Sequence, residues 1–142
     1  MTLERHERAG TCDTPEDAAA MRAFLERYHA RRLPWSADMD SSLASNGIAL
    51  ELYRKLGGGP CDSPNETTPF DMTTHLPRIT LPTLFVAGEY DYASPETLQL
   101  YRRLVPGSRL VSIPNSGHIT MHDQPAREIR ALRDFLRRVE RR

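Results

Sequence analysis

The sequence predicts an α/β fold built around a parallel sheet, and three observations lead to this prediction. The second half of the chain alternates strand and helix patterns, which is the order of a parallel sheet with crossover helices. The predicted strands are short, continuous apolar runs, as expected where both faces of a strand are covered. The chain has 142 residues, of which 39% are hydrophobic and 27% charged, and this suits a single globular domain at most.

The first predicted helix spans residues 14–33, TPEDAAAMRAFLERYHARRL. Thr14 is a favoured N-cap residue, and Pro15 suits the first helical turn. Two acidic residues follow near the positive end of the helix dipole. Apolar residues then recur at helical spacing, at Met21, Phe24, Leu25 and Tyr28. The tripeptide Leu-Pro-Trp at 33–35 ends the helix.

Residues 42–56 form a second expected helix, because their apolar residues can supply one face. A loop follows at 57–69, GGGPCDSPNETTP, where turn-forming residues dominate. A loop of this length in a compact domain is often functional.

The second half contains the strand and helix alternation. The expected strands are TLFVAG (83–88) and RLVSIP (109–114), and the expected helices are 94–108 and 124–142. Ser94 is the N-cap of the first of these helices, followed by a proline. Two strands alone would leave open edges and much apolar helix surface exposed. We therefore expect the end of a larger sheet whose earlier strands lie outside these residues.

Charge and composition exclude several classes of partner. The formal net charge is zero and the pI is about 7.0, so nucleic acid and anionic membranes are not expected as partners. Cys12 and Cys61 are far apart and lack a CxxC companion, which predicts neither a zinc site nor a disulfide framework. The first ten residues are polar and do not resemble a signal peptide, and no apolar run has membrane-spanning length. We expect a cytoplasmic protein without a cofactor.

An aspartate and a histidine follow the two predicted strands. Asp91 lies three residues beyond Gly88, and His118 lies in a tight loop after the second strand. A histidine that acts as a general base needs a carboxylate partner, and such groups gather at the carboxyl ends of parallel strands. Either residue alone would be a turn or surface residue, but their order at two strand ends favours a catalytic pair. Glu89 is a rival carboxylate that lies closer to the strand end.

Other candidate residues have simpler interpretations. Ser94 is explained as an N-cap and Ser116 as a turn former, so neither is expected to be a nucleophile. His122 lies four residues after His118, but the segment lacks the glutamate of H-E-x-x-H, so no metal site is expected. The remaining histidines are expected at the surface, namely His6, His29 and His75.

The segments PTLFVAGEYDYASP and IPNSGHITMHDQP resemble the acid-bearing loop and the histidine loop of the α/β-hydrolases. Further segments, GTCDTPED, FLERYHARRLPW and LGGGPCDSP, resemble the later cap region of proline iminopeptidases and their tricorn-associated relatives. The resemblance implies that residues 1–76 form the later part of a helical cap and residues 77–142 the C-terminal β-α-β-α part of the hydrolase core. It makes Asp91 the triad acid and His118 the general base.

Two features depart from the family pattern. The chain contains no G-x-S-x-G motif and no HGGP-like oxyanion loop. The iminopeptidases recognise the free amino group of a substrate with carboxylates, and the resemblance implies Asp62 at one of these places. Tyr92 stands where some relatives carry a second carboxylate, and it cannot supply a negative charge.

The resemblance therefore implies the C-terminal part of a serine hydrolase that releases N-terminal residues from peptides or cleaves amide or ester bonds. Without the nucleophile, the chain is expected to be inactive alone. Three explanations remain open: a truncated or mis-started gene reading, one half of a split enzyme with a separate N-terminal half as partner, or a non-catalytic binding remnant.

Overall fold

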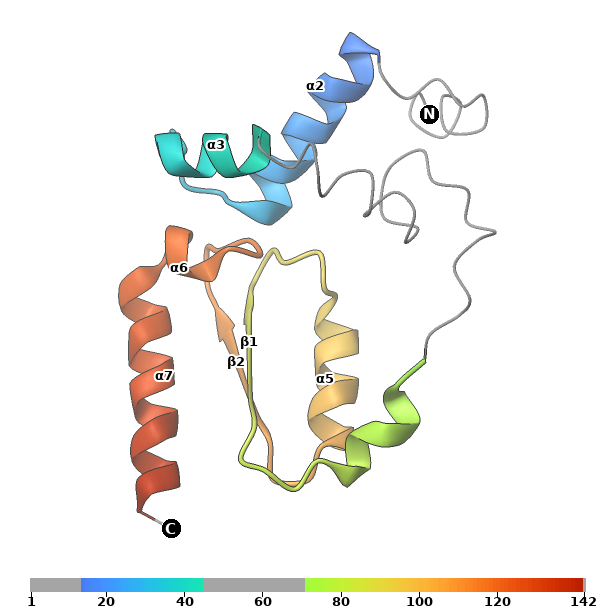
Figure 1. Cartoon of the computed structure of the whole chain (residues 1–142), viewed down its shortest axis with the longest axis vertical. Helices are drawn as coiled ribbons and strands as arrows, with labels where there is room; N and C mark the ends of the chain where they lie inside the picture. Colours follow the sequence, from blue (N-terminus) through green and yellow to red (C-terminus); the bar gives the residue numbers. More distant parts are fainter. Residues whose placement is uncertain (1–13, 45–70, 142) are drawn as a thin grey trace. The chain divides into compact units, whose positions relative to one another are not determined.

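The computed structural model describes residues 14–44 and 71–141, which fall into two compact units (Figure 1). The first unit holds residues 14–23 and 34–44, and the second holds residues 24–33 and 71–141. The predicted division into 1–76 and 77–142 stays a prediction.

Helix α2 (Pro15–Phe24) begins where the sequence predicts. The backbone N–H of Asp17 donates to Thr14 Oγ1 at 3.2 Å, and the Thr14 hydroxyl donates to the Asp17 carboxylate at 2.6 Å. The Asp17 N–H is a donor of the first turn that has no partner within the helix, and the Thr14 hydroxyl oxygen satisfies it.

The predicted extension of this helix to residue 33 is wrong. Regular helix gives way to the π-helical turn η1 (Leu25–His29), closed by the N–H of Ala30 donating to the carbonyl of Leu25 at 3.0 Å. From Tyr28 to Arg32, backbone groups bond to residues about 90 positions away in the sequence. These tertiary hydrogen bonds replace the helical ones, so propensity alone does not decide where the helix ends.

Helix α3 (Ala37–Ala44) begins earlier than the predicted start at residue 42. Ser36 is its cap, because its hydroxyl oxygen accepts the N–H of Met39 at 3.3 Å. Within the first unit, Trp35 is buried, and the Arg22 guanidinium lies 3.9 Å from the centre of its ring. Residues 45–56 and the expected loop 57–69 lie outside the described residues.

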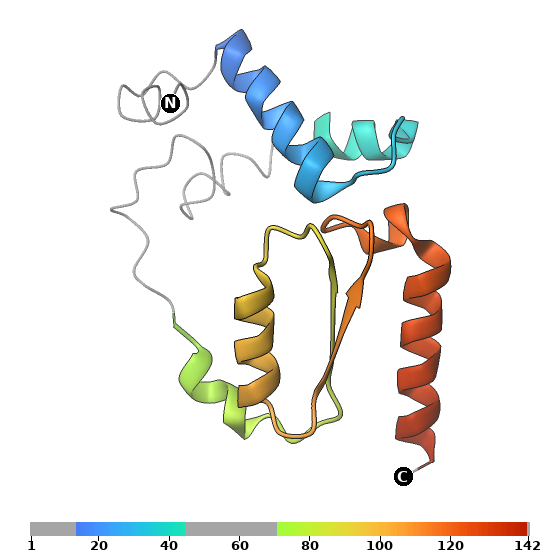
Figure 2. The ribbon, with the colours of Figure 1, turned by 180° about the vertical axis from the view of Figure 1, so that it is seen from behind.

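The second unit contains the sheet and its helices. In chain order the elements are η2 (Thr73–Arg78), β1 (Leu84–Gly88), α5 (Pro95–Leu104), β2 (Arg109–Ile113), α6 (Thr120–Asp123) and α7 (Pro125–Glu140). Strands β1 and β2 pair in parallel, with Leu84 opposite Arg109 and Gly88 opposite Ile113. Helices α5 and α7 lie on opposite faces of this pair (Figure 2). The predicted α/β alternation is therefore confirmed, while the two short helices η2 and α6 were not predicted.

Local signals explain the crossover from β1 to β2. Ser94 Oγ accepts the N–H of Thr97 at 3.2 Å, as expected of an N-cap, and Pro95 opens α5. Gly107 has a φ of 72°, which lets the chain turn into β2. Val105 and Ile113 are almost completely buried.

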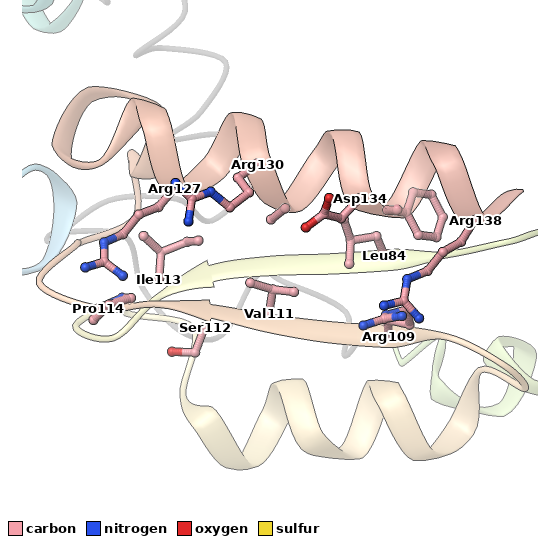
Figure 3. Close-up of a pocket in the computed structure, with 12 residues that line it drawn as sticks. Leu84, Arg109, Val111, Ser112, Ile113, Pro114, Arg127, Arg130, Asp134 and Arg138 are labelled. Carbon is pink, nitrogen blue, oxygen red and sulfur yellow. The ribbon is translucent and has the colours of Figure 1, made fainter. Parts of the chain in front are cut away.

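Much of the apolar surface in the second unit remains exposed. Three apolar residues of α7 have exposed fractions of 41–54%, namely Ile129, Leu132 and Leu136. A groove of about 280 Å³ lies between β2 and α7, and Arg109 and Arg138 line one end of it (Figure 3). Among the described helices, none has the length and apolar character needed to cross a membrane.

Gly88 is packed against backbone, which leads to a stability prediction. A Cβ at this position would clash with the carbonyl oxygens of Ser116 and Gly117. We expect Gly88→Ala to lower the free energy of unfolding by at least about 2 kcal/mol, measured by urea denaturation. Gly107→Ala is the control, because a Cβ there meets open space and only the positive φ is unfavourable, at about 1 kcal/mol. Equal losses in the two variants would contradict the steric explanation.

Candidate active site

Asp91 is held in a tight turn directly after β1. Its N–H donates to the carbonyl of Gly88 at 3.2 Å, and its Oδ1 accepts the N–H of Ala93 at 2.9 Å. The carboxylate bonds the backbone two residues ahead, as aspartate commonly does in turns. The Asp91 side chain is only 5% exposed, so the turn fixes a buried carboxylate at the carboxyl end of the sheet.

The histidine loop continues the pairing of the two strands beyond their ends. The N–H of Glu89 donates to the carbonyl of Ile113, and the N–H of Tyr90 donates to the carbonyl of Ser116, both at 2.9 Å. The Glu89 carboxylate accepts the N–H of Asn115 at 2.9 Å. Glu89, the rival carboxylate, therefore fixes the start of the histidine loop.

The structure brings the predicted acid and base together. His118 Nδ1 lies 3.1 Å from Asp91 Oδ1 and 3.2 Å from Asp91 Oδ2. An ionised carboxylate only accepts hydrogen bonds, so in the neutral imidazole Nδ1 carries the proton and Nε2 keeps its lone pair. The His118 side chain is 41% exposed. This geometry suits a ring that takes a proton at Nε2, and the catalytic roles of the two residues stay predictions.

Two aromatic rings border His118. The ring centre of Tyr92 lies 4.2 Å from that of His118, and the ring centre of His29 lies 5.8 Å away. The prediction of a surface position for His29 is wrong, because its ring is half-buried and its Nδ1 is buried without a hydrogen-bond partner among the described residues. The one feature of the sequence that could have indicated a special position for this histidine is the segment FLERYHARRLPW, which contains it and resembles the proline iminopeptidases.

Burial and charge keep His29 neutral. Burial lowers the pKa of His29, and a positive charge on His118 lowers this pKa further. The carboxylates of Asp123 and Asp91 act in the opposite direction but do not outweigh these effects. His29 therefore brings no positive charge next to the His118 ring near neutral pH.

Residues 28–29 hold the histidine loop through the backbone. The N–H of His118 donates to the carbonyl of Tyr28, and the N–H of Ile119 donates to the carbonyl of His29, both at 2.8 Å. A Cβ on Gly117 would come within 2.6 Å of the Tyr28 oxygen. This close approach of two backbones explains the glycine of the S-G-H sequence.

The other candidate side chains have structural partners. The Ser116 hydroxyl is completely buried and donates to the carbonyl of Gly117 at 3.0 Å, which agrees with its interpretation as a turn residue. His122 Nε2 donates to the carbonyl of Arg32 at 2.9 Å. Within residues 14–44 and 71–141, no three metal-ligating side chains cluster. The proposed substrate residue Asp62 and the two cysteines lie outside the described residues.

A parallel strand pair with helices on both faces and an Asp–His pair at its carboxyl end is the arrangement of the C-terminal part of an α/β-hydrolase. No protein-family model matches the chain. Its sequence is 31% identical to a proline iminopeptidase of Heyndrickxia coagulans over 144 residues, covering 97% of this chain and 48% of that protein. The predicted resemblance to the proline iminopeptidases is thus confirmed.

Solved structures agree with this similarity. The crystal structure of VinJ superposes with a TM-score of 0.81 at 30% identity, and that of the proline iminopeptidase of Mycobacterium smegmatis with 0.80 at 28%. Each match covers 96% of this chain and 46% of the solved chain. The chain therefore has the predicted fold class and spans about half the length of these relatives.

The pKa of His29 leads to a prediction about pH. A histidine whose pKa is lowered on folding binds its proton more readily in the unfolded chain. Stability is therefore present above the ordinary pKa of 6.5 and is lost as the pH falls below it. We expect His29→Phe, which keeps an aromatic ring without a titrating group, to lose less stability than the wild type on acidification. Urea denaturation at about pH 7.5 and pH 5 measures this.

The control for this experiment is His75→Gln, because His75 is exposed on η2. This variant should keep the pH dependence of the wild type. A His29→Phe chain whose midpoint falls as steeply as that of the wild type would show that His29 is not the responsible group.

Proposed function

We propose that this chain carries the acid and the general base of a serine hydrolase similar to the proline iminopeptidases. The observation that supports this proposal is the hydrogen bond between Asp91 and His118 at the carboxyl ends of two adjacent parallel strands. His118 Nε2 takes the proton of a serine hydroxyl that attacks the scissile carbonyl. Asp91 holds the ring and stabilises the imidazolium. The same histidine then activates the water that hydrolyses the acyl enzyme.

The proposed substrate is a short peptide that loses its N-terminal residue, or a related amide or ester. The named relative from Heyndrickxia coagulans is a proline iminopeptidase, which supports the peptide as substrate. Asp62 is our candidate for binding the free amino group. Tyr92 packs its ring against His118 and brings no negative charge there. We therefore propose a less strict preference for an N-terminal proline than in relatives with a second carboxylate.

The serine and the oxyanion donors are proposed to come from outside these 142 residues, because the sequence contains neither G-x-S-x-G nor a matching oxyanion loop. Loss of a single oxyanion donor lowers turnover by about 10²- to 10³-fold. The exposed apolar residues of α7 support a missing partner layer. The proposed catalytic site has the same composition whether the serine and the oxyanion donors belong to the same polypeptide or to a separate one. The second candidate function is a non-catalytic binding role, which the absence of a G-x-S-x-G motif from the sequence favours.

The first prediction concerns the chain alone. We expect the purified 142-residue chain to hydrolyse proline p-nitroanilide and p-nitrophenyl acetate no faster than buffer containing an inert protein, because it has no activated nucleophile. Spectrophotometric release of the chromophore measures this. Turnover at the level of an ordinary esterase, lost on Ser116→Ala, would mean that the chain supplies its own nucleophile.

The second prediction concerns complementation. The part of the Heyndrickxia coagulans relative that this chain does not match, about half of that protein, is expressed separately and mixed with it. We expect turnover to appear, and Asp91→Asn or His118→Ala to lower it by about 10⁴-fold or more, as for other triad members. His75→Gln is the control and should retain the activity. A complex that forms but is equally active with His118→Ala would favour the non-catalytic role.

A further inference from the structure

Asp123, on the short helix α6, has a carboxylate that the proposed reaction does not use. It is 6% exposed and lies five residues after His118. Its oxygens accept the N–H of Gly117 at 2.8 Å, the N–H of Arg31 at 2.9 and 3.0 Å, and the N–H of Arg32 at 2.8 Å. One buried carboxylate therefore gathers three backbone donors from two segments that are far apart in the sequence.

We propose that Asp123 is a positioning residue that fixes the His118 ring against Asp91 by clamping the histidine loop onto residues 28–32. This inference rests on the proposed function only for the role of His118. Gly117 directly precedes His118, so the hydrogen bond to its N–H restrains the peptide plane from which the histidine follows. Charge-assisted hydrogen bonds of this kind are roughly twice as strong as neutral ones.

Residues 28–32, which we call the strap, contact the loop at successive positions. The strap carbonyls of Tyr28 and His29 accept the N–H groups of His118 and Ile119. At the other end of the strap, the N–H groups of Arg31 and Arg32 bind Asp123. Two restraints thus hold His118 to the strap. One is the hydrogen bond of its own N–H to a strap carbonyl. The other runs from the N–H of the preceding residue through the Asp123 carboxylate to the strap N–H groups.

The alternatives for Asp123 fit less well. Each of its oxygens already accepts two backbone N–H contacts, which suits a residue that holds the chain in place better than one that transfers protons. The carboxylate also bonds no N–H of its own helix, which makes a capping role unsuitable. Burial raises the pKa of Asp123, but its hydrogen bonds to Arg31, Gly117 and Arg32 and a positive charge on His122 outweigh this, so the carboxylate remains ionised at neutral pH.

Nuclear magnetic resonance of the uniformly ¹⁵N-labelled 142-residue chain tests the proposal without any hydrolysis assay, because it reports both the His118 ring and the Gly117 amide. In the wild type we expect the His118 ring in its Nδ1–H form, with a downfield Nδ1–H proton bound to Asp91. Asp123→Asn places an amide NH₂ against backbone N–H donors and removes the charge. We expect this variant to lose the Nδ1–H preference and to exchange the Gly117 amide proton about tenfold faster or more, because the local opening free energy falls.

Two further variants serve as references. Asp91→Asn should lose the Nδ1–H preference while the Gly117 amide keeps its slow exchange. Asp134→Asn removes an exposed carboxylate on α7 and should leave both signals unchanged. An Asp123→Asn chain that is folded, keeps the wild-type His118 form and retains the exchange rate at Gly117 overturns the proposal.

If Asp123→Asn does not fold, Asp123→Glu is tested in its place. The longer side chain keeps the charge but displaces the loop, so we expect a folded chain with a weakened Nδ1–H signal. Wild-type signals in this variant overturn the proposal, as does a wild-type chain that lacks the Nδ1–H proton altogether. A complementation experiment that gives no turnover, with the Asp123→Asn effect present, would contradict the proposed function and leave this inference intact.

Discussion

The parallel pairing of β1 and β2, continued beyond the strand ends, is the interaction on which the candidate site depends. The register that sets Gly88 opposite Ile113 continues past the strand ends. Backbone hydrogen bonds there join the segment that begins at Glu89 to the segment that ends at Ser116. Backbone hydrogen bonds thereby align the loop of Asp91 with the loop of His118, which lies 27 residues later. The hydrogen bond between Asp91 and His118 is a consequence of this backbone alignment, and so is the close approach that admits only glycine at position 88.

The parts of this structure that could be predicted are those with local signals. The caps at Thr14 and Ser94 and the apolar strand runs depend on neighbouring residues, so the starts of α2 and α5 and both strands could be predicted. Placing Asp91 beside His118 needed only the rule that parallel strands end at the same edge of a sheet.

What could not be predicted depends on distant partners. The π-helical turn at 25–29 and the exit of the chain beyond it are determined by hydrogen bonds to the histidine loop, which lies about 90 residues later. His29 carries the same local pattern as a surface histidine, since nothing nearby in the sequence indicates that Tyr92 and His118 cover it. Asp123 likewise reads as a polar residue before a helix. Its importance appears only with the strap in place.

The strap also bears on how this chain can be divided. Residues 24–33 pack with the second unit although the residues on either side of them belong to the first, so the polypeptide passes between the units three times. A polypeptide beginning at residue 77 would contain Asp91, His118 and Asp123. Its histidine loop would nevertheless lack the backbone hydrogen bonds to the strap. The hydrolase-like portion is therefore not a module that a single cut can excise. A gene fusion that keeps the histidine loop in this geometry must therefore also keep residues 28–32.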